Sequence, residues 1–93
     1  MAQISDLPRY MQDSVWGYIQ YGRPIGDFLT AVFSNDLVGA YSRADDVNSA
    51  AMRDYASFLY NEAPRGCWGS AEAVQRWQSH SGLSGNRTEE TTQ

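Results

Sequence analysis

The sequence predicts an all-α fold, a compact bundle of four to five short helices with a disordered C-terminal tail. Apolar residues recur at helical spacing in several segments, and no segment shows the alternation of a strand. Glycine and proline stand at the ends of these segments. The 93 residues, 42% hydrophobic and 13% aromatic, suit one small folded domain. We therefore expect a flexible N-terminus over residues 1–6, a single helical domain over 7–83 and a disordered tail over 84–93, which lacks apolar side chains.

The first predicted helix covers about residues 7–21 and ends at Gly22, which can take the left-handed conformation of a helix end. Its core face carries Leu7, Met11, Val15 and Tyr18, flanked by Tyr10, Ile19 and Tyr21. Trp16 points the other way, into a polar arc. Another element covers this tryptophan, or it is exposed for a partner.

The segment after Gly22 predicts a tight connection and then a central helix. Pro24 fixes a backbone angle in the connection, and Asp27 favours a helix start. Phe28, Leu29, Val32 and Phe33 make this second helix apolar on much of its surface. The polar run at 34–36 favours a break before a third helix over about 36–43, with Leu37, Val38 and Tyr41 facing inward. One continuous helix over 27–43 is the alternative that the spacing permits.

Two further helices are predicted, over about residues 46–63 and 71–81. Asp45 or Asp46 caps the first, Pro64 ends it, and its inner face carries Val47, Ala51, Met52, Tyr55, Phe58 and Leu59. Ser70 caps the second, which turns Val74 and Trp77 inward and ends at Gly82. The loop between them holds the single cysteine, Cys67, which we expect in the core.

Catalytic and metal-binding patterns are scarce. One Cys and one His cannot form an intramolecular disulfide or a paired zinc-ligand motif. The sharpest catalytic hypothesis is a Cys67/His80 dyad, because a helix N-terminus lowers a thiol pKa; a small buried residue in a tight loop is the simpler interpretation. The glycine-rich run 66–70 lacks the lysine of a phosphate-binding loop. We expect no enzyme activity, no metal and no cofactor.

The charge balance restricts the partners. Seven basic residues, all arginine, and eleven acidic residues give a net charge of -4, which argues against a protein that coats nucleic acid. A small nucleic-acid-associated regulator is the alternative, if the fold gathers Arg23, Arg43, Arg53 and Arg65. No long apolar run predicts a membrane segment, and the single cysteine fits a reducing cytoplasm.

The remaining candidates are surface residues. Exposed aromatic and arginine side chains are the usual anchors of protein interfaces. The predicted partner-binding residues are Trp16, Tyr21, Arg23, Tyr60, Arg65 and Trp68. Self-association as a homo-oligomer with a structural role would explain the same residues.

Several short sequence motifs resemble those of a family of small phage and prophage proteins of GC-rich bacteria. The motifs are the run 22–37, Arg43-Ala-Asp45, the run Phe58-Leu-Tyr-Asn-Glu-Ala-Pro64 and Gly66-Cys-Trp-Gly-Ser70, and the resemblance covers about residues 8–83. It implies a small helical accessory protein made in the host cytoplasm. Such a protein would bind and inhibit or redirect a host protein, most plausibly a CRISPR-type defence complex. The resemblance carries no catalytic residues over to this chain.

Overall fold

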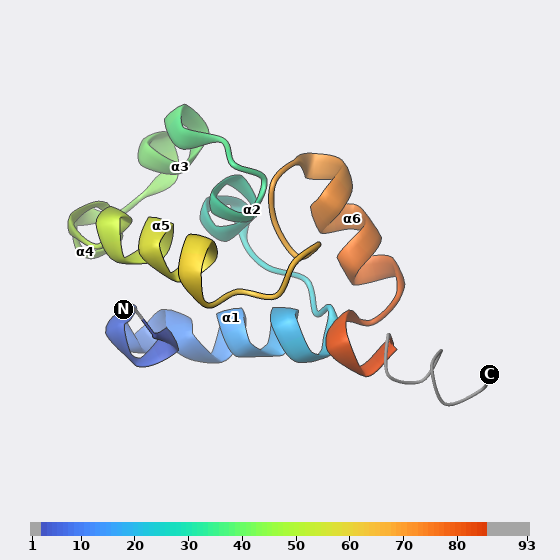
Figure 1. The fold of residues 1–93 in the computed structure, drawn as a ribbon. Coiled ribbons are helices and arrows are strands. Elements are labelled where there is room, and N and C mark those ends of the chain that lie inside the picture. The colour runs from blue at the N-terminus through green and yellow to red at the C-terminus, as the bar shows by residue number, and fades with distance from the viewer. Residues whose placement is uncertain (1–2, 86–93) are drawn as a thin grey trace.

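The computed structural model describes residues 3–85 and confirms the all-α fold (Figure 1). These residues contain no strand. The elements are η1 (Ile4–Asp6), α1 (Arg9–Tyr21), α2 (Asp27–Phe33), α3 (Leu37–Arg43), α4 (Asp46–Ala50), α5 (Met52–Asn61) and α6 (Ala71–Ser79). The tail expected to be disordered lies almost wholly outside the described residues, and its first two residues belong to a helical turn over 82–85.

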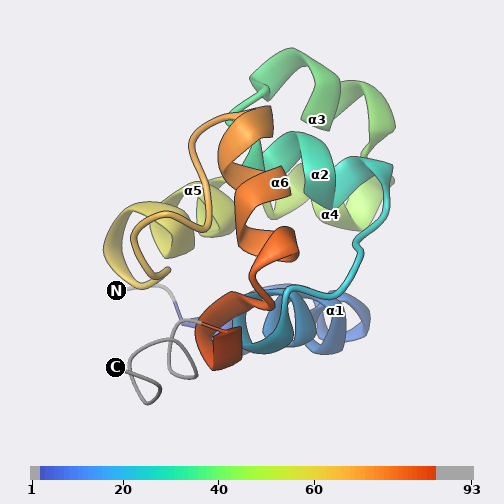
Figure 2. The ribbon, with the colours of Figure 1, turned by 90° about the vertical axis from the view of Figure 1, so that its right-hand side faces the viewer.

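The helix α2 lies at the centre of the molecule, as the sequence predicts. It buries Phe28, Leu29, Ala31, Val32 and Phe33, five of its seven residues. The other helices surround it, with α1 and α3 at opposite edges in both views (Figures 1 and 2). A helix that is apolar on most of its surface has to be covered on most of its surface, which explains its central place.

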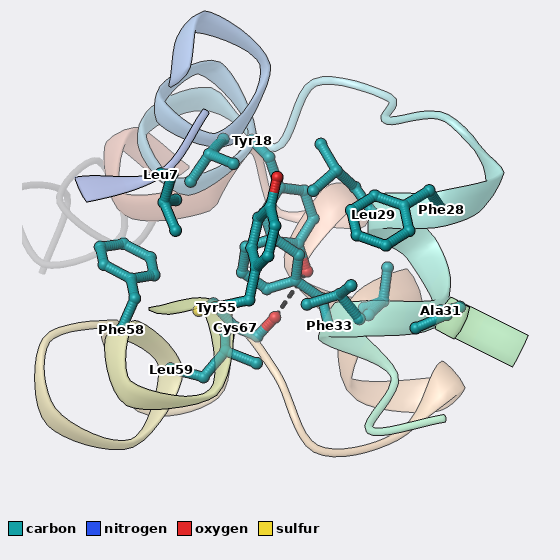
Figure 3. Close-up of a cluster of buried hydrophobic side chains, with 14 of the residues drawn as sticks. Leu7, Tyr18, Phe28, Leu29, Ala31, Phe33, Tyr55, Phe58, Leu59 and Cys67 are labelled. Atoms are coloured by element: carbon teal, nitrogen blue, oxygen red, sulfur yellow. Dashed lines mark hydrogen bonds between the residues drawn. The ribbon is translucent and has the colours of Figure 1, made fainter. Parts of the chain in front are cut away.

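The core joins α1, α2 and α5 to the loop before α6 (Figure 3). The Tyr18 ring lies 4.8 Å from the Phe33 ring, and the Tyr18 hydroxyl donates a 2.7 Å hydrogen bond to the Cys67 carbonyl. Both partners are buried, so this bond fixes the loop against α1 without leaving a polar group unpaired. The predicted core placement of Phe58, Leu59 and Cys67 is confirmed.

The break between α2 and α3 is confirmed, and the continuous helix is wrong. Asn35 has a φ of 63°, which no helix continues through. The Asp36 carboxylate then accepts the backbone N–H of Gly39 at 3.0 Å and caps α3. The helix α3 is therefore rotated about its axis relative to a continuation of α2, and turns different residues toward the core.

The single helix predicted over 46–63 is wrong, because the chain divides it at Ala51 into α4 and α5. Asn48, the one buried polar residue of the described core, accepts a 2.8 Å hydrogen bond from the Tyr55 hydroxyl. The backbone bends at Ala51, whose ψ is 5°. Val47, expected to face inward, is exposed on the short α4. The hydrogen bond from Tyr55 to Asn48 joins α4 and α5 across this bend.

Two smaller differences concern the N-terminal region. Residues Ile4–Asp6, expected to be flexible, form a 3₁₀ turn, and Ile4 packs against the core. The Tyr10 hydroxyl donates to the Asp45 carboxylate, which also caps α4 by accepting the Asn48 N–H at 2.7 Å. These hydrogen bonds lower the pKa of Asp45 and link α1 to the start of α4.

Candidate functional site

A groove of about 720 Å³ lies between α3 and α5. Most of its lining is apolar, and its full lining is Val32, Asn35, Asp36, Leu37, Ala40, Tyr41, Met52, Arg53, Tyr55, Ala56, Ser57, Leu59, Tyr60, Asn61 and Trp68. The floor includes buried core residues, whereas the walls come from exposed positions of α3 and α5. A concave apolar surface with a few polar groups is the usual form of a binding site.

The helix α3 carries large apolar side chains that the fold leaves uncovered; Leu37 and Tyr41 line the groove, whereas Val38 does not. The exposed fractions are 65% for Leu37, 75% for Val38 and 49% for Tyr41. The prediction that these residues face inward is wrong. The new rotation of α3 after Asn35 turns Gly39 and Ala40 toward the core instead. We call the three exposed residues, Leu37, Val38 and Tyr41, the α3 ridge.

The α5 wall contributes the most exposed aromatic residue of the described chain, Tyr60, with an exposed fraction of 82%. Trp68 is half-buried and lines the groove while packing against the core. The Gly69 N–H donates to the Phe33 carbonyl at 2.8 Å, which holds this loop beside the end of α2. The structure thus places two of the predicted partner-binding residues, Tyr60 and Trp68, in one groove.

The groove has opposite charges toward its two ends. The helices α3 and α5 run in roughly opposite directions (Figure 2). Asp36 precedes α3 and therefore shares an end with Asn61, the last residue of α5. Arg53 lies in the first turn of α5, at the end where α3 finishes. A ligand along the groove would meet a carboxylate at one end and a guanidinium at the other.

Three other predicted residues form a separate cluster at the end of α1. The Trp16 and Tyr21 rings pack edge to face, 5.4 Å apart, and the Arg23 guanidinium carbon lies 4.9 Å from the centre of the Tyr21 ring. All three are exposed. A Cβ at Gly17 would lie 3.2 Å from Arg23 Cδ, so this glycine leaves room for the arginine. We call Trp16, Tyr21 and Arg23 the aromatic platform.

The aromatic platform and the groove belong to different surfaces. The platform lies on α1 and the residues just after it, whereas α3 lies at the opposite edge of the molecule (Figure 2). Arg65, the sixth predicted residue, is exposed in the turn before Cys67 and lines neither surface. The six predicted residues therefore do not form one site.

Cys67 is not placed to act as a nucleophile. Its side chain is fully buried, and burial raises the pKa of its thiol to about 12, so the thiol keeps its proton at neutral pH. The His80 ring packs edge-on against Trp77, 5.2 Å away. Residues 3–85 contain no group of three or more His, Cys, Asp or Glu that could hold a metal ion. No helix in this part of the chain has the length and hydropathy needed to cross a bilayer.

The sequence reasoning missed the α3 ridge, Met52 and Arg53 as site residues. An apolar pattern at helical spacing predicts a buried face, because burial is the usual reason for such a pattern. The small pair Gly39-Ala40 was the available signal, since small residues mark the face of a helix that approaches its neighbours closely. Both are buried in the structure.

Comparison of the chain with protein-family models, with curated proteins and with solved structures gives no match. The groove between α3 and α5 is the surface on which the most exposed apolar side chains gather.

Proposed function

We propose that the chain is a non-enzymatic protein-binding module that docks other chains on the surface formed by the α3 ridge and the groove beside it. The observation that carries the proposal is the exposure of Leu37, Val38 and Tyr41 on one seven-residue helix. Burying a large apolar side chain is worth roughly 1.5–3 kcal/mol. A partner that covers these three partly exposed side chains would gain a part of that free energy from each of them.

The proposed partner is a protein of the bacterial host. The resemblance to small phage proteins supports this choice, with a CRISPR-type defence complex as the working hypothesis and the host cytoplasm as the place of action. The groove supports it too, because apolar grooves between helices accept helices with anchors spaced three or four residues apart. Binding in the groove would then block or redirect the host protein.

The distribution of arginines favours a protein partner over nucleic acid. Arg23 belongs to the aromatic platform, whereas Arg53 lines the groove between α3 and α5. The Arg43 guanidinium donates to the Gly39 carbonyl of its own helix at 3.2 Å. Cations spread in this way would neutralise few neighbouring phosphates on a chain whose net charge is -4.

Capture of host proteins on the immobilised chain tests the proposal with a matched pair of variants. Leu37→Glu places a carboxylate on the α3 ridge, and Val47→Glu places one on α4, outside the groove. Each position is exposed and lies at the start of its helix, where a carboxylate is tolerated. We expect a host protein that the wild-type chain and Val47→Glu retain and that Leu37→Glu loses by about tenfold or more. Equal capture by all three chains would contradict the docking surface.

A further inference from the structure

The α3 ridge and the groove lie side by side on one surface, which makes that surface complementary to itself. A twofold axis brings the same patch of two copies together, so that each ridge faces the groove of the other copy. Leu37 and Tyr41 of the ridge line the groove, and Val38 is the exposed neighbour of Leu37 on the same helix. No second surface has to be supplied to fill the groove.

The charges of the groove support the same arrangement. Asp36 and Arg53 stand toward opposite ends of it. A twofold axis through the middle of the groove reverses the direction of the second copy, so Asp36 of each copy meets Arg53 of the other. One ion pair would form at each end of such a pair of copies, and opposite charges at such positions fix the register of an interface.

The groove also has the composition of an interface. Its lining is mostly apolar, with residues such as Ala40, Met52 and Leu59, and its neutral polar residues are Asn35, Ser57 and Asn61. A mostly apolar lining with some polar groups is typical of the buried part of protein interfaces. Soluble proteins rarely leave large apolar patches open to water, and a closed pair covers the patch without forming an open chain of copies.

We propose that, when no host protein is bound, the occupant of the groove is the α3 ridge of a second copy of this chain. This inference rests on the proposed docking surface and names what covers it in the free protein. The host protein and the second copy then compete for the same residues. The twofold pair is a storage form of the binding module that dissociates when the host protein binds.

Sedimentation equilibrium of the free protein tests this pair. We expect the wild-type chain to sediment with twice the chain mass at roughly 100 µM, a concentration at which an interface of ordinary size associates. Leu37→Glu should sediment as a monomer at that concentration, and Val47→Glu should behave as wild type. A wild-type chain that stays monomeric, or a dimer that Leu37→Glu leaves intact, would overturn the inference.

Charge reversal at Arg53 tests the twofold register. If Arg53 had only a structural role, a second substitution at Asp36 would not restore association. Arg53→Glu places a carboxylate against Asp36 of the other copy and should weaken the dimer by about tenfold or more. Asp36→Asn keeps an N-cap on α3 and removes that repulsion, so the double variant Asp36→Asn, Arg53→Glu should associate more tightly than Arg53→Glu alone. Equal association of the single and double variants would overturn the proposed register.

The two proposals fail in different ways. A monomeric wild-type chain whose host capture is lost in Leu37→Glu would refute the pair and keep the docking surface. A Leu37→Glu chain that still captures the host protein would refute the docking surface. Addition of the captured host protein should dissociate the wild-type dimer; a complex containing two copies joined through the groove would overturn the proposed competition.

Discussion

Cys67 is the residue whose chemistry the fold changes most. Its neighbours in the sequence, two glycines and a helix cap, are typical of an activated thiol, because a helix N-terminus favours the thiolate. The fold instead turns the side chain into the core, beneath the hydrogen bond from Tyr18 to its carbonyl. Burial disfavours the charged form, and this effect outweighs the backbone hydrogen bond that acts to lower the pKa of the thiol.

This burial predicts a loss of stability at alkaline pH. The pKa of the thiol is about 12 in the folded chain and near its ordinary 9.0 when unfolded, so the unfolded state releases its proton first. The free energy of unfolding should therefore hold below about pH 9 and fall as the pH rises above it. Burial also raises the pKa of Tyr18 and Tyr55, which adds to the fall at higher pH.

Urea denaturation of wild type and Cys67→Ala at about pH 7 and about pH 10 measures this fall. The alanine variant has no thiol to ionise, so its free energy of unfolding should change less between the two pH values. The quantity compared is the change in the free energy of unfolding between the two pH values within each protein. The stability lost because alanine is smaller than cysteine is the same at both pH values and cancels. Equal falls in the two proteins would show that Cys67 does not ionise on unfolding.

At the scale of elements, the ends of α1 and α6 depend on two glycines. Gly22 and Gly82 have φ values of 68° and 62°. A Cβ at Gly22 would lie 2.9 Å from the backbone nitrogen of Gly82, and a Cβ at Gly82 would lie 2.6 Å from the Ile19 carbonyl. The Trp77 indole donates to the Tyr18 carbonyl at 3.0 Å in the same contact between the end of α1 and the turn after α6, which we call the α1–α6 joint. Only residues without a side chain allow the two backbones to approach this closely.

Replacement of Gly22 by alanine should loosen this joint. A left-handed conformation costs a residue with a side chain about 1–2 kcal/mol, and contact with the backbone of Gly82 adds to that cost. Gly26→Ala is the matched control, because its φ is -71° and no atom lies within 4 Å of the added Cβ. Thermal melts should show a clear loss for Gly22→Ala and a smaller one for Gly26→Ala. Similar melting temperatures for the two variants would contradict the close approach.

The elements that local chemistry determines were predictable from the sequence. Gly22 ends α1 and Asp36 starts α3, because a glycine and an aspartate do this wherever they occur near a helix end. The division at Ala51 was not predictable, since no glycine or proline marks it. It accompanies the pairing of Asn48 with Tyr55, which the sequence does not reveal.

The candidate site was predictable only in part, because it too depends on how the helices are rotated and packed. Tyr60 is recognisable because it falls on the outer edge of a regular helix, and it does line the groove. The α3 ridge depends on the rotation that Asn35 gives to α3, and a helical pattern alone does not record that rotation. Trp16, Tyr21 and Arg23 were each predicted, but their gathering into one platform required the turn after Gly22.

At the scale of the whole molecule, the fold separates the core from the proposed docking surface. The central α2 and the residues around it form the core, whereas the α3 ridge adds little to it. Such a division lets the ridge change without loss of the fold, because surface substitutions usually alter stability by less than about 0.5 kcal/mol. The proposed docking surface depends on this independence.

The free energy of unfolding of the double variant Leu37→Glu, Val38→Glu tests that independence most directly. Urea denaturation should be run at a concentration where each chain sediments as a monomer, with Leu29→Ala as the core reference. We predict a double variant within about 1 kcal/mol of wild type, against a loss of about 2–5 kcal/mol for Leu29→Ala. A double variant that loses as much as Leu29→Ala would show that the chain itself covers the α3 ridge, which would contradict the docking surface.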